Sequence, residues 1–295
     1  GVLDAPDNTP GNKTLFSKSV ARTLLAKIYA EKPLRDYTKV IQYCDEVKAD
    51  GFDLVDDFSD LFGMNAAGTD AKMRNTKESI LEAQFTSGAG NWCTWMFGRD
   101  LVNWNNNFTW AKWVTPSRDL ISAFKQEGDE VRFKESIVYY DCNWSNYYPS
   151  DNYPFMYKCR SANSSIIKYR YADVLLLKAE ALIMQDTPDL EGAADIIDEV
   201  RDRAKLGALH TSVRSNKNVL LNALLKERRL ELAFEGQRWF DLVRLDKVEE
   251  VMNAVYSKDS GRKAQIYTFD KNSYRLPIPQ SVIDANDKIH QNPGY

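Results

Sequence analysis

Apolar side chains recur at helical spacing in several separate stretches of this chain. In the stretch 16–30, valine, leucine and isoleucine residues fall on one face of a helix. A short polar break follows, and Asp36 is a plausible N-cap for a second helix that runs to about Ala49. Gly51 ends that helix, as glycine commonly does after the last helical turn. The pattern therefore predicts two consecutive helices separated by a short break.

The same layout recurs later in the chain. Residues 171–184 are apolar nearly all round, as is typical of a helix sandwiched between neighbours. After a break that ends at Pro188, a residue suited to the start of a helix, a second helix runs to about Ala204. Small residues such as Ala172 and Ala179 let partner helices approach closely. Two such hairpins resemble tetratricopeptide (TPR) repeats.

Three further helices and a small hairpin are predicted from less regular patterns. Helices are expected over residues 218–235 and 238–243, and Thr115–Pro116 opens another helix with threonine as its N-cap. Apolar and polar residues alternate over 131–139, which predicts a strand. Residues 156–159 would supply the second strand of a small hairpin.

Two stretches match neither a helix nor a strand. Residues 87–114 and 141–155 are longer than ordinary connections, and such long loops are commonly functional or disordered. The predicted fold class is mainly all-α. It is a single domain over residues 1–295, built of TPR-like helical hairpins with these two irregular insertions and a small β-hairpin.

A charged helix is predicted within the segment LLNALLKERRLELAFEGQRWFDLVRL. Arg228 falls in its leucine stripe, so the guanidinium must be paired or must reach water. Glu227, Glu231 and Glu235 follow one another at every fourth position. Two interpretations exist: a catalytic carboxylate pair as in glycoside hydrolysis, and a structural ion-pair network. The second is favoured, with Arg228 held by Glu231 or by a carboxylate of an adjacent helix. The row of glutamates would pair with Arg228, Arg229, Arg238 and Arg244.

Bulk composition narrows the functional classes. The 295 residues include 39 basic and 42 acidic side chains, which give a net charge of −3. Nucleic-acid-binding proteins have a clustered excess of basic residues, so this composition does not indicate nucleic-acid binding. The four cysteines form no CxxC pair and there are two histidines, so no zinc site is expected. Asp56, Asp57 and Asp60 lack the spacing of a calcium loop, and no glycine-rich phosphate loop is present. Metal and cofactor are therefore both expected to be absent.

Tryptophans gather in the first insertion. Trp92, Trp95, Trp104, Trp110 and Trp113 stand there among Asn103, Asn105, Asn106 and Asn107. A second group in the other insertion holds Trp144, Asn146, Tyr147 and Tyr148. Aromatic rings cover the apolar faces of sugars, while amides and hydroxyls meet their hydroxyl edges. The alternative is that single tryptophans anchor the loops in the core, since tryptophan is highly buried on average. The candidate ligand-binding residues are Trp92, Trp95, Trp104, Asn105, Asn106, Trp110, Trp144 and Tyr147.

Several motifs resemble one protein family. The run KERRLELAFEGQRWFDLVRL, the ending YRLPIPQSVIDANDKIHQNPGY and the helix IIKYRYADVLLLKAEALIMQ are similar to segments of the SusD/RagB family. The opening PGNKTLFSKSVARTLLAKIYAEKPLRDY, and FDLVDDFSDLF with KESILEAQF, also resemble that family and stand in its order. Residues 87–114 match no motif of the family, and the chain begins well inside the family's usual span. The chain therefore resembles the carboxy-terminal, larger part of such a protein.

The resemblance implies a helical binding protein without catalytic residues or cofactor. Proteins of this kind bind an extracellular nutrient, most commonly an oligosaccharide, on the outer face of a Bacteroidetes-type outer membrane. They deliver it to a SusC-like TonB-dependent transporter. The lipid anchor would belong to an amino-terminal region that this sequence lacks. Two other functions remain open: a TPR-type module that binds a protein or peptide, and a glycoside hydrolase.

Overall fold

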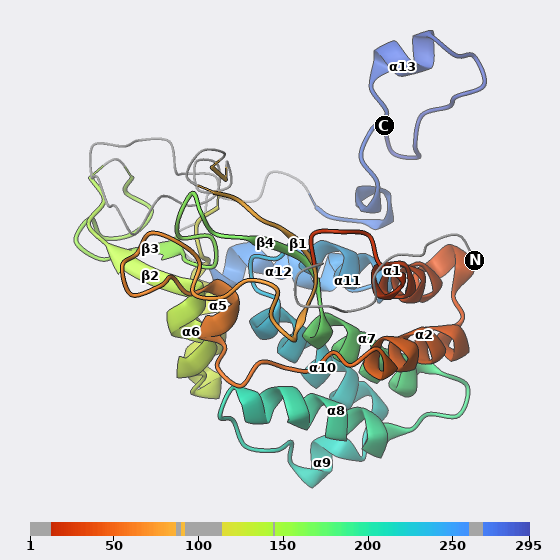
Figure 1. Ribbon diagram of the computed structural model, residues 1–295. Coiled ribbons are helices and arrows are strands. Elements are labelled where there is room, and N and C mark those ends of the chain that lie inside the picture. Colours follow the sequence, from red (N-terminus) through yellow and green to blue (C-terminus); the bar gives the residue numbers. More distant parts are fainter. Residues whose placement is uncertain (1–12, 87–89, 92–113, 144, 260–267) are drawn as a thin grey trace. The chain divides into compact units, whose positions relative to one another are not determined.

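The computed structural model describes residues 13–86, 90–91, 114–143, 145–259 and 268–295. It confirms a mainly helical chain, and this part of the chain also contains two small two-stranded sheets (Figure 1). The described helices are α1 (Lys18–Ala30), α2 (Tyr37–Ala49), α3 (Ser59–Phe62), α5 (Arg118–Glu127), α6 (Glu130–Ser136), α7 (Tyr171–Met184), α8 (Leu190–Arg203), α9 (Thr211–Arg214), α10 (Lys217–Glu231), α11 (Arg238–Arg244), α12 (Val248–Lys258) and α13 (Gln280–Asp284), with 3₁₀ turns η1 (Lys32–Leu34) and η2 (Lys271–Tyr274). The strands are β1 (Ser79–Ala83), β2 (Ile137–Tyr140), β3 (Tyr153–Met156) and β4 (Ile166–Arg170).

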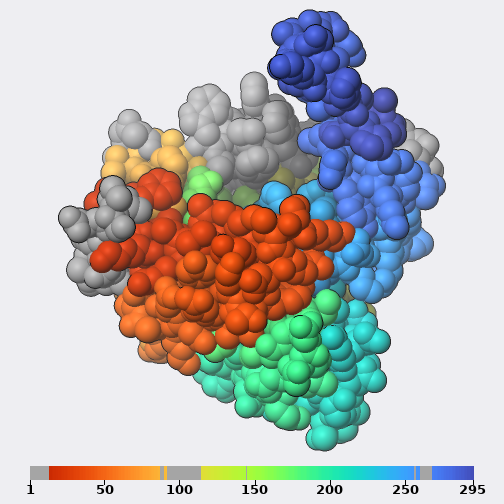
Figure 2. Space-filling model, turned by 90° about the vertical axis from the view of Figure 1, so that its right-hand side faces the viewer, coloured from red at the N-terminus to blue at the C-terminus, as the bar shows by residue number. Residues whose placement is uncertain are grey.

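The two predicted helical hairpins form the centre of the fold. As predicted, Asp36 caps α2, and its side chain accepts a hydrogen bond from the Lys39 backbone N–H. In α7, twelve of fourteen residues are buried, which confirms the prediction from its all-round apolar sequence. Helix α1 packs on α2, α2 on α7 and α7 on α8, so the four helices form a row (Figures 1 and 2). In Figure 2 the α1–α2 pair, red to orange, faces the viewer.

The main hydrophobic core lies inside this row. Alanines supply the closest contacts, since Ala26, Ala172, Ala179 and Ala193 are all fully buried there. Small side chains where two helices cross allow a shorter distance between the helix axes than large side chains do. Helix α10 completes this core, and Leu220 and Leu224 are buried against α7 and α8.

The two sheets are each antiparallel pairs. Strand β1 pairs with β4, so residues 79–83 lie beside the strand that immediately precedes α7. Strand β2 pairs with β3 in regular register, from Ile137 opposite Met156 to Tyr140 opposite Tyr153. The β1–β4 pair is absent from the sequence-based prediction, whereas β2–β3 is the predicted small hairpin with shifted bounds.

Two sequence-based expectations in this region are wrong. Residues 130–136 form helix α6 rather than a strand, because Asp129 caps them and its Oδ1 accepts the Arg132 backbone N–H. Helix α5 is capped by Ser117 rather than Thr115, since Ser117 Oγ accepts the Leu120 N–H at 3.1 Å.

The described chain divides into two compact units, one up to Gln237 and the other from Arg238 onward. In the second unit, α11 packs on α12 and α12 on η2. The family-like ending folds back on itself, because Asn292 donates to the Leu276 carbonyl and Tyr295 to the Arg275 carbonyl. The prediction of one domain over residues 1–295 stays a prediction. None of the helices described is both long and apolar enough to cross a membrane.

Candidate ligand-binding site

A polar loop joins β2 to β3 and carries the part of the candidate site that the structure describes. The base of the loop is closed by a backbone hydrogen bond from Cys142 N–H to the Ser150 carbonyl at 2.6 Å. Below the loop, Cys142, Tyr153 and Phe155 form a small buried apolar cluster. The hairpin therefore holds Asn143 and residues 145–150 at or near the surface on a packed base.

Three tyrosine rings are stacked edge to face along this loop. The Tyr147 and Tyr148 ring centroids are 5.0 Å apart at 88°, and those of Tyr148 and Tyr153 are 5.6 Å apart at 78°. Such edge-to-face pairs are favourable by about 0.5–1.5 kcal/mol beyond the area they bury. The Tyr148 hydroxyl donates to the Pro116 carbonyl at 2.7 Å, which fixes the central ring to the start of α5.

Arg118, in the first turn of α5, lies against two of these rings. Its guanidinium carbon is 4.6 Å from the Tyr147 centroid and 4.1 Å from the Tyr148 centroid. The same guanidinium donates a hydrogen bond to the Tyr147 carbonyl. Cation–π contacts of this kind stabilise by about 0.5–2 kcal/mol and hold the tyrosine planes in place.

An open cavity of about 830 Å³ lies over this cluster. It is lined by Arg118, Asn143, Ser145, Asn146, Tyr147, Tyr148, Pro149 and Ser150. Its walls combine aromatic faces with amide, hydroxyl and guanidinium groups. A polyol needs this combination, because each sugar ring has apolar C–H faces and hydroxyls that both donate and accept hydrogen bonds.

A second cavity of about 550 Å³ has a different chemistry. Phe62, Met156, Ile166, Ile167 and Phe234 form much of its wall, with Lys158 and Glu235 among the polar groups. Burial lowers the pKa of Lys158 to about 8, although the Glu235 carboxylate acts in the opposite direction. Its mainly apolar wall matches a sugar poorly, so the first cavity is the better candidate for a glycan.

One of the eight predicted ligand-binding residues can be placed. Tyr147 lines the first cavity. The others, Trp92, Trp95, Trp104, Asn105, Asn106, Trp110 and Trp144, lie outside the described residues. The sequence-based prediction missed Arg118, Asn143 and Ser145. Arg118 belongs to a different element, and only the contact between α5 and the loop brings it to Tyr147.

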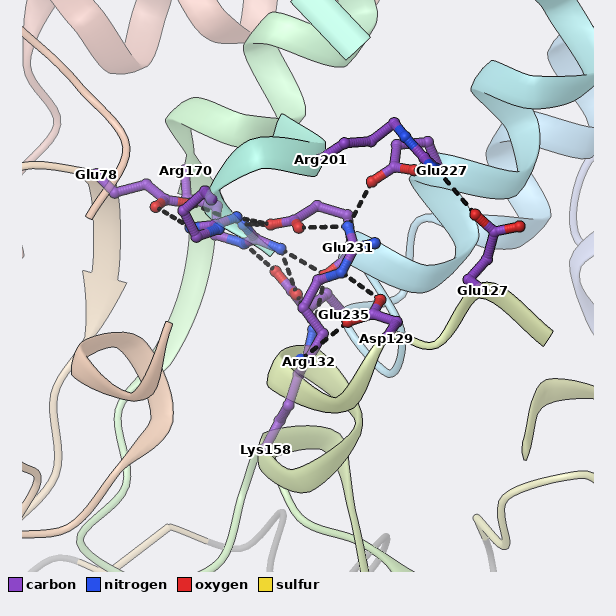
Figure 3. Close-up of polar contacts among 11 residues, drawn as sticks. Glu78, Glu127, Asp129, Arg132, Lys158, Arg170, Arg201, Glu227, Glu231 and Glu235 are labelled. Carbon is purple, nitrogen blue, oxygen red and sulfur yellow. Dashed lines mark hydrogen bonds and ion pairs between the residues drawn. The ribbon is translucent and has the colours of Figure 1, made fainter. Parts of the chain in front are cut away.

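The glutamate row of α10 is an ion-pair network rather than a catalytic pair (Figure 3). Arg132 Nη1 contacts Glu227 at 2.5 Å and Glu231 at 3.0 Å. Arg170 contacts Glu231 at 2.5 Å and Glu235 at 2.7 Å. The network interpretation is therefore confirmed.

The predicted partners of that row are wrong. Arg228 pairs instead with Asp173 of α7, which confirms the alternative that a carboxylate of an adjacent helix holds it. Arg229 pairs with Asp119 of α5 and Arg244 with Asp241. The glutamates instead form ion pairs with arginines and a lysine of other elements, because their side chains point into the protein interior. These partners are Arg132, Lys158, Arg170, Arg201 and Arg203.

Burial and charge act against each other in this network. Burial alone would raise the pKa of the Glu231 carboxyl, but Arg203, Arg170 and Arg132 outweigh it and hold that pKa well below its usual value. For Glu227 the balance is reversed, since burial raises its pKa more than Arg132 lowers it. A carboxylate fixed by three guanidinium groups is neither a proton donor nor an accessible nucleophile, so Glu231 is structural.

The acidic run 53–60 is also engaged in ion pairs. Lys72 contacts Asp57 at 2.9 Å and Asp60 at 2.7 Å, and Lys77 contacts Asp56 at 3.1 Å. Among the described residues, no group of three or more histidine, cysteine or acidic side chains is placed to hold a metal ion.

Comparison with known proteins identifies the family. Residues 156–295 match the model of the SusD family. A SusD-like protein of Formosa agariphila is 36% identical over 143 residues, which make up 46% of this chain and 27% of that protein.

Solved structures share the fold along nearly the whole chain. A SusD superfamily protein from Parabacteroides distasonis superposes with a TM-score of 0.71 at 22% identity, covering 96% of this chain and 64% of its own. A laminarin-binding SusD-like protein superposes with a TM-score of 0.65 at 24% identity, covering 97% of this chain and 64% of its own. The chain thus spans less than two thirds of the length of these relatives. Residues 156–295 thus belong to the SusD family, and the chain shares the fold of SusD-like proteins along nearly its whole length.

Proposed function

We propose that this chain binds an extracellular oligosaccharide, without altering it, in the cavity beside Tyr147. The observation that carries the proposal is the cluster of Tyr147, Tyr148 and Arg118 at an open cavity with amide and hydroxyl walls. A sugar ring would lie against the half-buried tyrosine rings there, while Asn143 and Asn146 would exchange hydrogen bonds with its hydroxyls.

The order of the cluster supports binding. The Tyr148 hydroxyl bond to Pro116 and the Arg118 contacts hold the rings before any ligand arrives. A preformed surface loses less conformational entropy on binding than a mobile one, which leaves more of the contact energy for affinity.

Two further observations support binding rather than hydrolysis. SusD family proteins are non-catalytic binding proteins. Hydrolysis by two carboxyls needs one of them to be an available acid, whereas Glu227, Glu231 and Glu235 are all held by arginine or lysine. A relative with the same fold is a laminarin-binding protein, which supports a glycan as the ligand class.

The proposal extends to the cellular setting. The protein would act at the outer face of the outer membrane, lipid-anchored in its full-length form. It would pass its ligand to a SusC-like TonB-dependent transporter. Membership of the SusD/RagB family supports this part of the proposal.

A titration with oligosaccharides tests the binding site. Laminarin fragments, other α- and β-glucans and hemicellulose fragments would be followed by calorimetry, and the recovered sugar would be examined by chromatography. We expect one class to bind and to be recovered intact. Tyr147→Ala should weaken that binding about tenfold, equivalent to about 1.4 kcal/mol.

The matched control is Tyr295→Ala, which removes an exposed tyrosine from the second unit. It should leave affinity unchanged. Equal affinity in wild type and Tyr147→Ala would exclude this cavity as the site, and shortened sugar products would exclude the non-catalytic function.

A further inference from the structure

The second cavity is built from segments that are far apart in the sequence. Phe62 ends α3 and Met156 ends β3, while Ile166 and Ile167 begin β4 and Phe234 follows α10. These apolar side chains surround a space of about 550 Å³, which is within the range of roughly 300–1,000 Å³ that is typical of small-molecule sites. The two cavities share none of the lining residues that the structure describes.

The turn after α10 leaves one side of this cavity open. Phe234 and Gly236 both have left-handed backbone conformations, with φ angles of 66° and 78°. Such residues are characteristic of the turn that ends a helix. A side-chain carbon added at Gly236 would meet no other atom within 4 Å. The glycine therefore contributes open space to the cavity wall, where a larger side chain would project into it.

The polar part of the wall has an excess of positive charge. Among the described residues, the charged side chains that line the cavity are Lys158, Lys168 and Glu235. Two cations share the Glu235 carboxylate, since Oε1 contacts Lys158 Nζ at 2.6 Å and Oε2 contacts Arg170 Nε at 2.7 Å (Figure 3). Lys168 is exposed and forms no ion pair with another described residue. Its charge is therefore available to an anionic ligand.

The two lysines of the wall differ in their exposure to water. The Lys158 side chain is buried, and its Nζ lies 4.7 Å from the centroid of the Phe62 ring. Burial lowers the pKa of Lys158, which shows how poorly this part of the cavity solvates a charge. We therefore expect the ionic group of a ligand to meet the exposed Lys168, where water still solvates both charges.

We propose that the second cavity binds a small amphipathic carboxylate, with its apolar body among the phenylalanine and isoleucine side chains and its carboxylate at Lys168. Burial of the apolar body supplies the affinity. The ion pair at Lys168 supplies orientation and discrimination by charge. A sugar would find few partners for its hydroxyls in this wall. The carboxylate site is separate from the proposed glycan site, and either can exist without the other.

Calorimetry with three simple ligands tests this proposal on the intact chain. Decanoate has an apolar chain and a carboxylate, decylammonium has a similar chain with the opposite charge, and acetate has the carboxylate without the chain. We expect decanoate to bind saturably and decylammonium to bind at least about tenfold more weakly. Acetate should show no saturable binding, because it has almost no apolar surface to bury.

Variants of the cavity wall separate this site from other apolar surface. Lys168→Glu should weaken decanoate binding about tenfold, whereas Lys217→Glu, at an exposed lysine that begins α10, should not change it. Ile166→Glu places a carboxylate in the half-buried apolar wall and should weaken decanoate binding as well. Circular dichroism would verify that this variant is folded, and Ile166→Ser replaces it if it is not. Tyr147→Ala, in the first cavity, should bind decanoate as wild type does.

Several results would overturn the proposal. Absence of saturable decanoate binding would do so, as would equal affinity for decanoate and decylammonium. Unchanged decanoate affinity in Lys168→Glu, or in the folded Ile166 variant, would exclude this cavity as the carboxylate site. Loss of decanoate binding in Tyr147→Ala would assign the ligand to the first cavity instead.

Discussion

Arg228 of α10 donates a hydrogen bond to Asp173 Oδ1 of α7 at 2.8 Å, and both side chains are buried. The other carboxylate oxygen, Oδ2, accepts from Lys27 of α1 at 2.6 Å. A single aspartate thus joins three helices that are far apart in the sequence.

Removal of this carboxylate should destabilise the fold strongly. Asp173→Ala leaves Arg228 and Lys27 without their shared partner inside the protein. We expect the free energy of unfolding to fall by about 3–5 kcal/mol, as is usual when one member of a buried ion pair is lost. Urea denaturation followed by circular dichroism measures this. Asp45→Ala, which removes a half-exposed partner of Lys178, should cost ~0–1 kcal/mol. A similar loss in both variants would contradict the special role of Asp173.

Acid should unfold the protein partly through Glu231. Arginines hold its folded-state pKa well below the ordinary value despite burial. A lowered folded pKa contributes stability that is complete above the unfolded pKa, about 4.3, and is lost as pH falls below it towards the folded pKa. Urea titrations between about pH 7 and pH 3 should show this loss.

Glu231→Gln supplies the comparison for that pH dependence. It should be less stable than wild type at neutral pH, and the gap should narrow as the pH falls below about 4. Glu227, whose pKa burial raises, responds in the opposite direction but is common to both proteins. A gap that stays constant across this range would argue against ionised Glu231 as the source.

Arg118→Lys should weaken sugar binding, and the lost ring contacts should lower stability by no more than about 2 kcal/mol. Arginine presents a flat guanidinium to the Tyr147 and Tyr148 rings, whereas a lysine ammonium is a compact point charge that cannot stack in this way. We expect affinity to fall about tenfold in calorimetry. Arg214→Lys, at a half-buried arginine of α9 that pairs with carboxylates of α8, is the matched control and should bind as wild type does. Unchanged affinity in Arg118→Lys would remove this arginine from the site.

Ala179→Leu should disrupt the packing of α7. Ala179 is completely buried in a helix that has neighbours on nearly every side. Added methyl groups there force helices apart at a cost of about 1–3 kcal/mol or more. Thermal and urea unfolding would measure this loss. Ala49→Leu, at an exposed position of α2, should change stability by less than about 0.5 kcal/mol, and an equal effect at both sites would contradict the close packing.

Local sequence was sufficient for the helices of the central row. Residues 171–184 are apolar on every side, and no other common element accommodates such a run so well. The start of α2 was predicted correctly from Asp36, because an N-cap side chain bonds to a backbone N–H only a few residues further along the chain. Both features depend on residues within a few positions of each other.

Long-range contacts explain where the sequence was not sufficient. Alternating apolar residues over 131–139 indicated a strand, yet Arg132 is drawn inside by Glu227 and Glu231 of α10, and the residues around it are helical. For the ligand site, the aromatic loop with Tyr147 could be predicted, but its contact with Arg118 depends on how α5 packs.

The ion-pair network also constrains the order in which the chain can fold. Arg132 meets Glu231 only 99 residues further along the chain. At about 5–20 residues per second, a ribosome takes roughly 5–20 seconds to supply that glutamate. During this interval the Arg132 guanidinium can pair with Asp129 but has neither Glu227 nor Glu231 as a partner, so its complete burial would leave part of its charge uncompensated. The burial of Arg132 between α6 and α10 is therefore completed late in synthesis, after α10 has emerged.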